Sequence, residues 1–203
     1  KYGINNEGAS AESSCTQCAT GRFLGTVGSY GQSCVACPWG KHQDMPGAAF
    51  CLNCISGRYQ DQQEQKDCKN CAVGQSSSTA ATSCVACPLG NHQDMPGAAF
   101  CLPCTPGKYN KRWGKKFCVE CAVGTASSSV GRSEECVSCS SGKYQAEKGM
   151  TACLNCIPGR YQDEEKQKDC KNCAFGQASS TAARKKCDSC IPGRYQDQQE
   201  QKD

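Results

Sequence analysis

The sequence predicts a small disulfide-rich fold: mostly irregular chain with short β-hairpins, forming an elongated tandem-repeat rod without a single large hydrophobic core. Three observations predict it. The 203 residues include 22 cysteines, a density typical of disulfide scaffolds. Leu, Ile, Val and Phe together also number only 22, which is too few for one large apolar core. The cysteines come as C-x-x-C pairs that recur along the whole chain, and such self-similarity indicates a tandem array.

Eleven tandem repeats of about 17 residues occupy positions 15–203, and we interpret positions 1–14 as the tail of a preceding repeat. They are called repeats 1 to 11 and start at Cys15, Cys34, Cys51, Cys68, Cys84, Cys101, Cys118, Cys136, Cys153, Cys170 and Cys187. Repeat types also cycle in threes, about every 50 residues. The repeat pattern is incomplete at both ends, so we expect the chain to be a segment of a longer array.

A glycine stands three residues after the second cysteine in all eleven repeats, from Gly21 to Gly193. A glycine at one fixed place predicts either a positive φ angle or a close approach of backbone. The arm that follows it, such as 58–60, is expected to be extended and to form a two-stranded hairpin, which is marginal without a covalent link. Helix content should be near zero.

The cysteines have three possible uses, and disulfides are favoured. Paired C-x-x-C motifs can form zinc ribbons, but most intervals here are a little short, and eleven pairs cannot be matched two to a four-cysteine site. A redox C-x-x-C needs one activated thiolate on a βαβ scaffold, and eleven copies argue against it. Metal and reactive thiols therefore stay as lesser alternatives, and no cofactor is expected.

Two disulfide schemes fit the spacing. One scheme closes two adjacent repeats into a module, in which the first of the four cysteines bonds to the third and the second to the fourth. Its period is two repeats, whereas the repeat types cycle in threes, so like repeats would have unlike disulfide environments. The other joins the second cysteine of each repeat to the first of the next and treats every repeat alike, so we favour it. It leaves Cys15 and Cys190 open to neighbouring repeats. Its bonds are Cys18–Cys34, Cys37–Cys51, Cys54–Cys68, Cys71–Cys84, Cys87–Cys101, Cys104–Cys118, Cys121–Cys136, Cys139–Cys153, Cys156–Cys170 and Cys173–Cys187.

The motif C-x-x-C-x-x-G-x-Y-Q, present at 51–60, 153–162 and 187–196, resembles the ephrin-receptor-like cysteine-rich repeat. It is more distantly similar to TNF-receptor modules. The resemblance extends over 15–203, although repeats such as 68–83 have Ser76 where Tyr59 aligns. It implies extracellular, elongated, disulfide-linked rods, which occur in receptors and in long surface arrays of unicellular eukaryotes, and it does not fix a ligand.

Composition argues against several function classes. The net charge is +4, with 23 basic and 19 acidic residues interspersed, so neither nucleic acid nor an anionic membrane is expected as a partner. The longest apolar runs are too short to insert into a bilayer. The two histidines, His42 and His92, occupy equivalent arms and have no paired acid and base around them. An enzyme is therefore not expected.

Serine- and threonine-rich stretches recur in one repeat type. They are interpreted first as ordinary loop residues and second as candidate O-glycan sites. The candidates are Ser76, Ser77, Ser78, Thr79, Ser127, Ser128, Ser129, Ser179, Ser180 and Thr181.

Nearly identical repeats display one surface many times, which suits lateral packing better than a single binding pocket. We therefore expect a secreted structural protein, outside the cell or on its surface, that forms part of a disulfide-linked fibre or surface-hair filament. Its partners would be further copies of itself or other fibre proteins, with glycans as a further possibility. A secretory signal would have been cleaved or lie outside this segment. The alternative is the stalk or ligand-binding ectodomain of a cell-surface receptor.

Overall fold

The computed structural model describes residues 16–25 and 33–197, and in these ranges it contains twenty two-residue strands and no helix. The chain divides into two compact units, residues 1–85 with 95–100, and residues 86–94 with 101–203. Both units consist of short hairpins joined by turns and irregular chain. The expected disulfide-rich fold class with short β-hairpins is confirmed.

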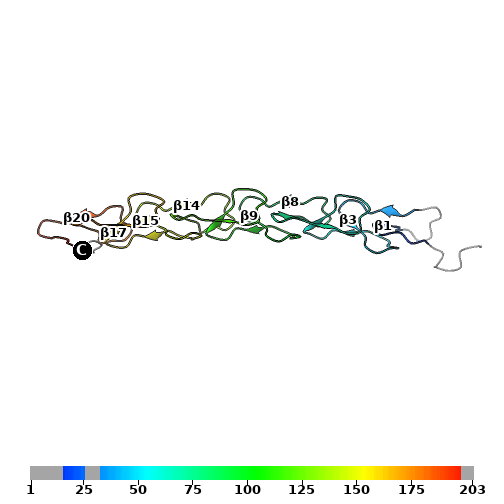
Figure 1. The fold of residues 1–203 in the computed structure, drawn as a ribbon, viewed down its shortest axis with the longest axis horizontal. Helices are drawn as coiled ribbons and strands as arrows, with labels where there is room; N and C mark the ends of the chain where they lie inside the picture. Colours follow the sequence, from blue (N-terminus) through cyan, green and yellow to red (C-terminus); the bar gives the residue numbers. More distant parts are fainter. Residues whose placement is uncertain (1–15, 26–32, 198–203) are drawn as a thin grey trace, which may run out of the picture. The chain divides into compact units, whose positions relative to one another are not determined.

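Each hairpin joins two neighbouring repeats. One strand follows the glycine of a repeat, and the other lies between the paired cysteines of the next; in β5–β6, Arg58 lies opposite Asn70 and Tyr59 opposite Lys69. The ten hairpins (Figure 1) are β1 (Arg22–Phe23) with β2 (Val35–Ala36), β3 (Lys41–His42) with β4 (Leu52–Asn53), β5 (Arg58–Tyr59) with β6 (Lys69–Asn70), β7 (Gln75–Ser76) with β8 (Val85–Ala86), β9 (Asn91–His92) with β10 (Leu102–Pro103), β11 (Lys108–Tyr109) with β12 (Val119–Glu120), β13 (Thr125–Ala126) with β14 (Val137–Ser138), β15 (Lys143–Tyr144) with β16 (Leu154–Asn155), β17 (Arg160–Tyr161) with β18 (Lys171–Asn172), and β19 (Gln177–Ala178) with β20 (Asp188–Ser189).

The buried interior is made of disulfides and polar side chains. Among the described residues the buried apolar ones are twelve cysteines, Ala126 and Ala178. The largest fully buried side chains are Gln60, Gln145 and Asn110. No large aliphatic or aromatic side chain in the described ranges is buried, so neither unit has an apolar core of the usual kind. Covalent bonds and hydrogen bonds take over that role.

The glycine shared by all repeats satisfies both expectations at once. All eleven copies have φ between +72° and +88°, a region that L side chains enter at a cost of about 1–2 kcal/mol. A Cβ on Gly57 would lie 2.1 Å from the carbonyl oxygen of Gly97, and one on Gly124 would lie 2.1 Å from that of Lys166. Each contacted carbonyl belongs to the repeat two places further along the chain. Absence of a side chain therefore lets repeats n and n+2 touch.

The residue whose carbonyl is contacted lies in a turn and has a positive φ angle, and its backbone connects three repeats. Lys166, at φ +60°, donates its backbone N–H to the carbonyl of Cys139 in the preceding repeat, at 2.8 Å. Its own carbonyl lies against Gly124, two repeats back. Gly97 and Ala183 occupy the same place, with N–H bonds to the carbonyls of Cys71 and Cys156. Stacking is thus specified by backbone rather than by side-chain packing.

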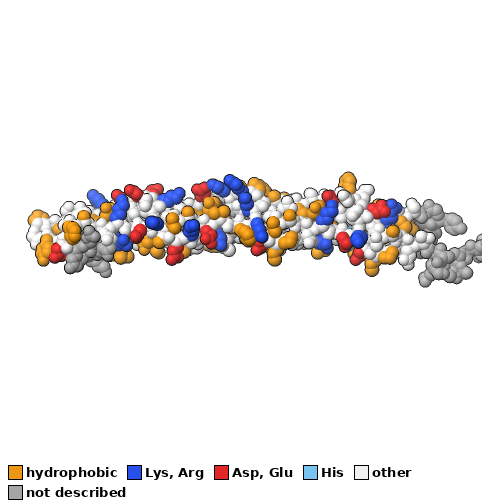
Figure 2. Space-filling model, in the orientation of Figure 1, with side chains coloured by type: hydrophobic (Ala, Val, Ile, Leu, Met, Phe, Trp, Pro, Cys, Tyr) orange, Lys and Arg blue, Asp and Glu red, His pale blue; other side chains and the backbone are white. Residues whose placement is uncertain are grey.

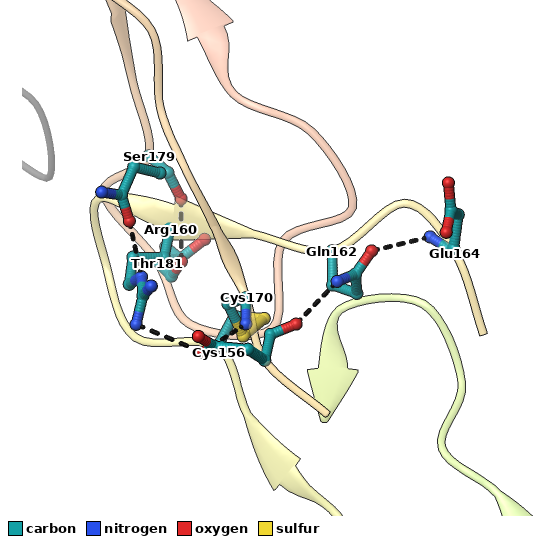
Figure 3. Close-up of a disulfide and its surroundings, with 9 residues drawn as sticks. Cys156, Arg160, Gln162, Glu164, Cys170, Ser179 and Thr181 are labelled. Atoms are coloured by element: carbon teal, nitrogen blue, oxygen red, sulfur yellow. Dashed lines mark hydrogen bonds and ion pairs between the residues drawn. A yellow bond between two sulfur atoms is a disulfide. The ribbon is translucent and has the colours of Figure 1, made fainter. Parts of the chain in front are cut away.

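A buried polar side chain lies three residues after the glycine in nine repeats. The glutamines among these residues hold the arm of their own repeat. Figure 3 shows Gln162, whose Oε1 accepts the N–H of Glu164 at 3.1 Å and whose Nε2 donates to the carbonyl of Asp169 at 2.7 Å. Gln43, Gln60 and Gln145 make the same two bonds. The nine residues are Gln43, Gln60, Ser77, Gln93, Asn110, Ser127, Gln145, Gln162 and Ser179.

The glycine contact predicts different costs for one substitution at two places. Gly124 and Gly149 have similar φ angles, +72° and +71°, but a Cβ on Gly149 would first meet the Glu120 side chain at 3.6 Å, an ordinary van der Waals contact. We expect Gly149→Ala to lower the free energy of unfolding by about 1–2 kcal/mol. Gly124→Ala should cost clearly more, because its Cβ also collides with the carbonyl of Lys166. Urea unfolding of the oxidised protein measures both, and equal costs would contradict the contact.

Replacing Gln162 by Met should remove both of its hydrogen bonds to the arm at nearly unchanged side-chain volume. Each such bond contributes about 0.5–1.5 kcal/mol, so we expect Gln162→Met to destabilise the arm by about 1–3 kcal/mol. Hydrogen exchange at the Glu164 amide should become faster by at least about ten-fold. Lys168→Met, at an exposed position of the same arm, is the control and should leave this amide protected. Unchanged exchange in the Gln162 variant would rule out the proposed role.

Candidate functional site

Ten disulfides link successive repeats in the described part of the chain and form what is called here the disulfide ladder. Each joins the second cysteine of one repeat to the first of the next, with Cα–Cα distances of 5.5–5.8 Å, within the usual range for disulfides. The pairs are Cys18–Cys34, Cys37–Cys51, Cys54–Cys68, Cys71–Cys84, Cys87–Cys101, Cys104–Cys118, Cys121–Cys136, Cys139–Cys153, Cys156–Cys170 and Cys173–Cys187.

The two ends of each disulfide differ in exposure. The second cysteine of every bonded C-x-x-C pair is buried, whereas the first is half-buried except at Cys68 and Cys170. Figure 3 shows the Cys156–Cys170 bond beside Gln162. Cys190 has a free thiol, and Cys15 lies outside the described residues. A reductant would therefore reach most of these bonds through their first cysteine.

One group of side chains has the composition of a metal site. The ligand atoms of His92, Cys104 and Cys118 lie within 4.8 Å of one another. The two sulfurs are joined in a disulfide, so neither is the thiolate that zinc requires. His92 Nδ1 lies 3.1 Å from the carbonyl oxygen of Leu102 and 3.3 Å from Cys118 Sγ. Because a carbonyl only accepts, Nδ1 carries the proton and serves as a donor beside the disulfide.

The candidate O-glycan residues fall into two groups. Ser77, Ser127 and Ser179 occupy the buried position three residues after the glycine. The Ser77 hydroxyl donates to the carbonyl of Arg58 at 3.0 Å, and that of Ser179 to the carbonyl of Thr181 at 3.2 Å. Their candidacy is corrected, because a glycosyltransferase cannot reach a buried, bonded hydroxyl in the folded chain. Ser76 is half-buried, and the exposed candidates are Ser78, Thr79, Ser128, Ser129, Ser180 and Thr181.

Ion pairs at the surface connect the arm of one repeat to the residue after the first cysteine of the next. The Lys69 ammonium lies 2.6 Å from the Asp61 carboxylate, and this hydrogen bond lowers the pKa of Asp61 and raises the pKa of Lys69. Asp163 and Lys171 form the equivalent pair at 2.7 Å, with the same direction of pKa change in each partner. Both pairs are half-exposed, and exposed pairs contribute little to stability. They orient the arms and create no reactive group.

Large apolar side chains are exposed at three recurring places, and together they are called the apolar set. The places are the residue after the first cysteine, the first or second residue after the second cysteine, and the residue before the next repeat. Figure 2 shows apolar side chains interspersed with charged ones over the visible face. The set comprises Val35, Leu52, Val85, Leu102, Val119, Val137 and Leu154; Trp39, Ile55, Val73, Leu89, Val123, Ile157, Phe175 and Ile191; and Phe50, Phe100 and Phe117.

Comparison with known proteins gives one family match. Residues 124–160 match the family model described as tyrosine-protein kinase ephrin type A/B receptor-like, a span that covers most of repeat 7, all of repeat 8 and the start of repeat 9. No curated protein matches the chain. No helix in the described ranges is long and apolar enough to cross a membrane. Repeats of this family are extracellular and typically non-enzymatic. The chain is a cysteine-rich repeat array, and its residues 124–160 are similar to the ephrin-receptor-like family.

Proposed function

We propose that this chain is a segment of an extracellular fibre or surface-hair filament that self-associates through the apolar set. Cysteine-rich repeats of this type have structural or receptor-ectodomain roles outside the cell. The observation that favours the fibre is the regular exposure of large apolar residues at the same places of successive repeats. An apolar surface of this kind is stabilised when another surface covers it.

A second copy of the chain is the occupant that the repeat spacing favours. Two copies carry the same apolar residues at the same spacing of about 17 residues, so one contact that forms brings the following ones into register. Burying an exposed Phe or Leu contributes about 1–2 kcal/mol. Many such weak contacts along one chain act together through their effective concentration. Basic and acidic residues are nearly balanced, 23 to 19, so net repulsion between copies is small.

The disulfide ladder suits a fibre that bears load. Each bond closes a loop of about 15 residues, and such a link stabilises a fold by about 3 kcal/mol. The bonds follow one another from repeat to repeat, so tension on the chain is carried past each hairpin by a covalent link. Exposed hydroxyls such as Ser128 and Thr181 are available for O-glycans on the fibre surface.

A receptor stalk or ligand-binding ectodomain is the second candidate, and the family match over 124–160 favours it. Electron microscopy of native material distinguishes the two functions. Filaments with a regular axial repeat support the fibre, and separate particles attached to a membrane support the receptor.

The ladder connectivity is testable by peptide mapping. We expect proteolysis of unreduced, alkylated protein to release the Cys54–Cys68 and Cys156–Cys170 pairs as linked peptides, with Cys190 alkylated. A Cys51–Cys68 link would show that adjacent repeats form closed modules instead. Zinc in the purified protein, with thiols free to alkylation, would overturn the ladder as a whole.

The apolar set predicts that a small group of surface substitutions disperses the assemblies. Phe50, Phe100 and Phe117 are 59–66% exposed, so Phe50→Ser, Phe100→Ser and Phe117→Ser together should leave the fold intact. We expect the concentration needed for assembly to rise at least about a hundred-fold, because three apolar contacts of about 1–2 kcal/mol are lost. Sedimentation velocity measures it.

The matched control changes polar residues at the same place of other repeats, Asp67→Ser with Lys186→Ser, which leaves the net charge unchanged. It should assemble like the original chain. A phenylalanine variant that assembles as well as the control would show that these side chains do not hold copies together.

A further inference from the structure

An open groove of about 300 Å³ lies over repeats 7 and 8, within the second unit. Serines 127–129 follow β13, Ser138 and Ser140 flank the buried Cys139, and Thr151 precedes the first cysteine of repeat 9. Arg132 and Lys143 supply two cationic groups to the same walls. No carboxylate lines the groove. It is therefore a polar, hydroxyl-rich site with positive charge.

Its hydroxyls are open to a ligand. Among the described residues, the side chains of Ser128, Ser129, Ser138, Ser140 and Thr151 make no hydrogen bond, and all five are exposed. A hydroxyl both donates and accepts, so a wall of such groups matches a ligand that carries several hydroxyls of its own. The groove volume lies at the lower end of the range for small-molecule sites.

Neither cation of the groove is paired with a carboxylate among the described residues. Arg132 donates from Nε and Nη2 to the carbonyl oxygen of Glu135, at 2.8 and 2.6 Å, so the guanidinium is held in place by a neutral acceptor. Lys143 has no carboxylate partner among the described residues. The neighbouring Glu135 carboxylate is bound by Lys111, and this hydrogen bond lowers its pKa. The field of the groove is therefore positive.

The groove chemistry is specific to these repeats. Repeats 4 and 5 are of the same types, one 50-residue cycle earlier, and have different residues at the same places. Where the groove has Ser138, Ser140, Lys143, Thr151 and Ala152, they have Ala86, Pro88, Asn91, Ala99 and Phe100. The groove therefore has three hydroxyls and one cation where repeat 5 has neither hydroxyl nor charge. The small Ala152 side chain also leaves space that the phenyl ring of Phe100 takes in repeat 5.

Further cations adjoin the groove. The N–H of Asn110 donates to the carbonyl of Arg132 at 3.0 Å, which brings the start of the basic arm 111–116 next to Arg132. Arg112, Lys115 and Lys116 in that arm are exposed and form no ion pair within the described ranges. A ligand longer than the groove would meet this arm.

We propose that the groove over repeats 7 and 8 binds an acidic saccharide, with its sugar hydroxyls on the serine and threonine wall and its anionic group between Arg132 and Lys143. The anionic group is a sulfate ester or a uronate carboxylate, and both carry the negative charge and the acceptor oxygens that the two cations require. Val137 belongs both to the apolar set and to the groove lining, but the polar contacts proposed for the saccharide do not depend on whether the chain assembles into fibres.

The test is a nuclear magnetic resonance titration of the full oxidised chain, shown by mass to carry no glycan, with three probes. They are a sulfated disaccharide of uronic acid and N-acetylgalactosamine, the same disaccharide without sulfate, and the neutral disaccharide lactose. We expect saturable shifts at 127–143 with the first probe. Equal affinity for the unsulfated acid would assign the contact to the carboxylate, and weaker binding of that acid would assign it to the sulfate.

Two variants localise the binding. Lys143→Gln should weaken it about ten-fold, the scale of one charge-assisted hydrogen bond, and Ala152→Phe, which restores the residue found at Phe100, should block the groove. Lys108→Gln, one residue after the glycine of repeat 6 and outside the groove, should have no effect. Equal binding of lactose, no saturable binding of either acid, or equal losses in Lys143→Gln and Lys108→Gln would overturn the proposal.

Discussion

The close approach of the repeat glycine to a carbonyl two repeats further along, found for seven of the eleven glycines in the described residues, is the constraint on which the fold depends. A Cβ at Gly40 or Gly107 would lie about 2 Å from the carbonyl oxygen of Ala80 or Gly149, so the glycine is required for this contact as well as for its φ angle. The same turn residues donate their N–H groups to the carbonyls of Cys54 and Cys121 in the repeat before them. The backbone of this one turn residue thus holds its own repeat against the repeat before it and against the repeat two places before it. Hairpins of two-residue strands, which are marginal alone, gain a fixed geometry from this stacking.

Much of this arrangement could be predicted from the residues. The invariant glycine indicated positive φ or close approach, and both hold. The requirement that like repeats have like environments favoured bonds from one repeat to the next, and the structure brings those cysteines together. These features depend on spacing alone, which a repeated sequence displays directly.

The polar interior could not be predicted in the same way, although its pattern is visible in the sequence. The residue three places after the glycine is Gln, Asn or Ser from repeat 2 to repeat 11. Aligning Gln60 with Ser77 across repeat types would have identified one shared position, and Ser77, Ser127 and Ser179 would not have been taken for surface hydroxyls. Burial of an amide depends on two backbone partners, such as the N–H of Gln62 and the carbonyl of Asp67, and neither is apparent before the arm is folded. The groove likewise depends on how repeats 7 and 8 lie together.

A disulfide and amide interior has a consequence for the surface. In most domains the large apolar side chains are buried in the core. Here the stacking of the repeats is fixed by backbone contacts, disulfides and buried glutamines instead. Residues such as Phe50, Ile55 and Val85 therefore remain outside without loss of the fold.

Surface positions can then vary from repeat to repeat with little effect on stacking, because they take no part in it. Repeats 7 and 8 illustrate this freedom: Ser140, Lys143 and Ala152 occupy the places that Pro88, Asn91 and Phe100 fill in repeat 5, while their glycines and cysteines are unchanged. Separation of the groups that fold the chain from those that face outward lets one array combine a uniform apolar set with a local polar groove.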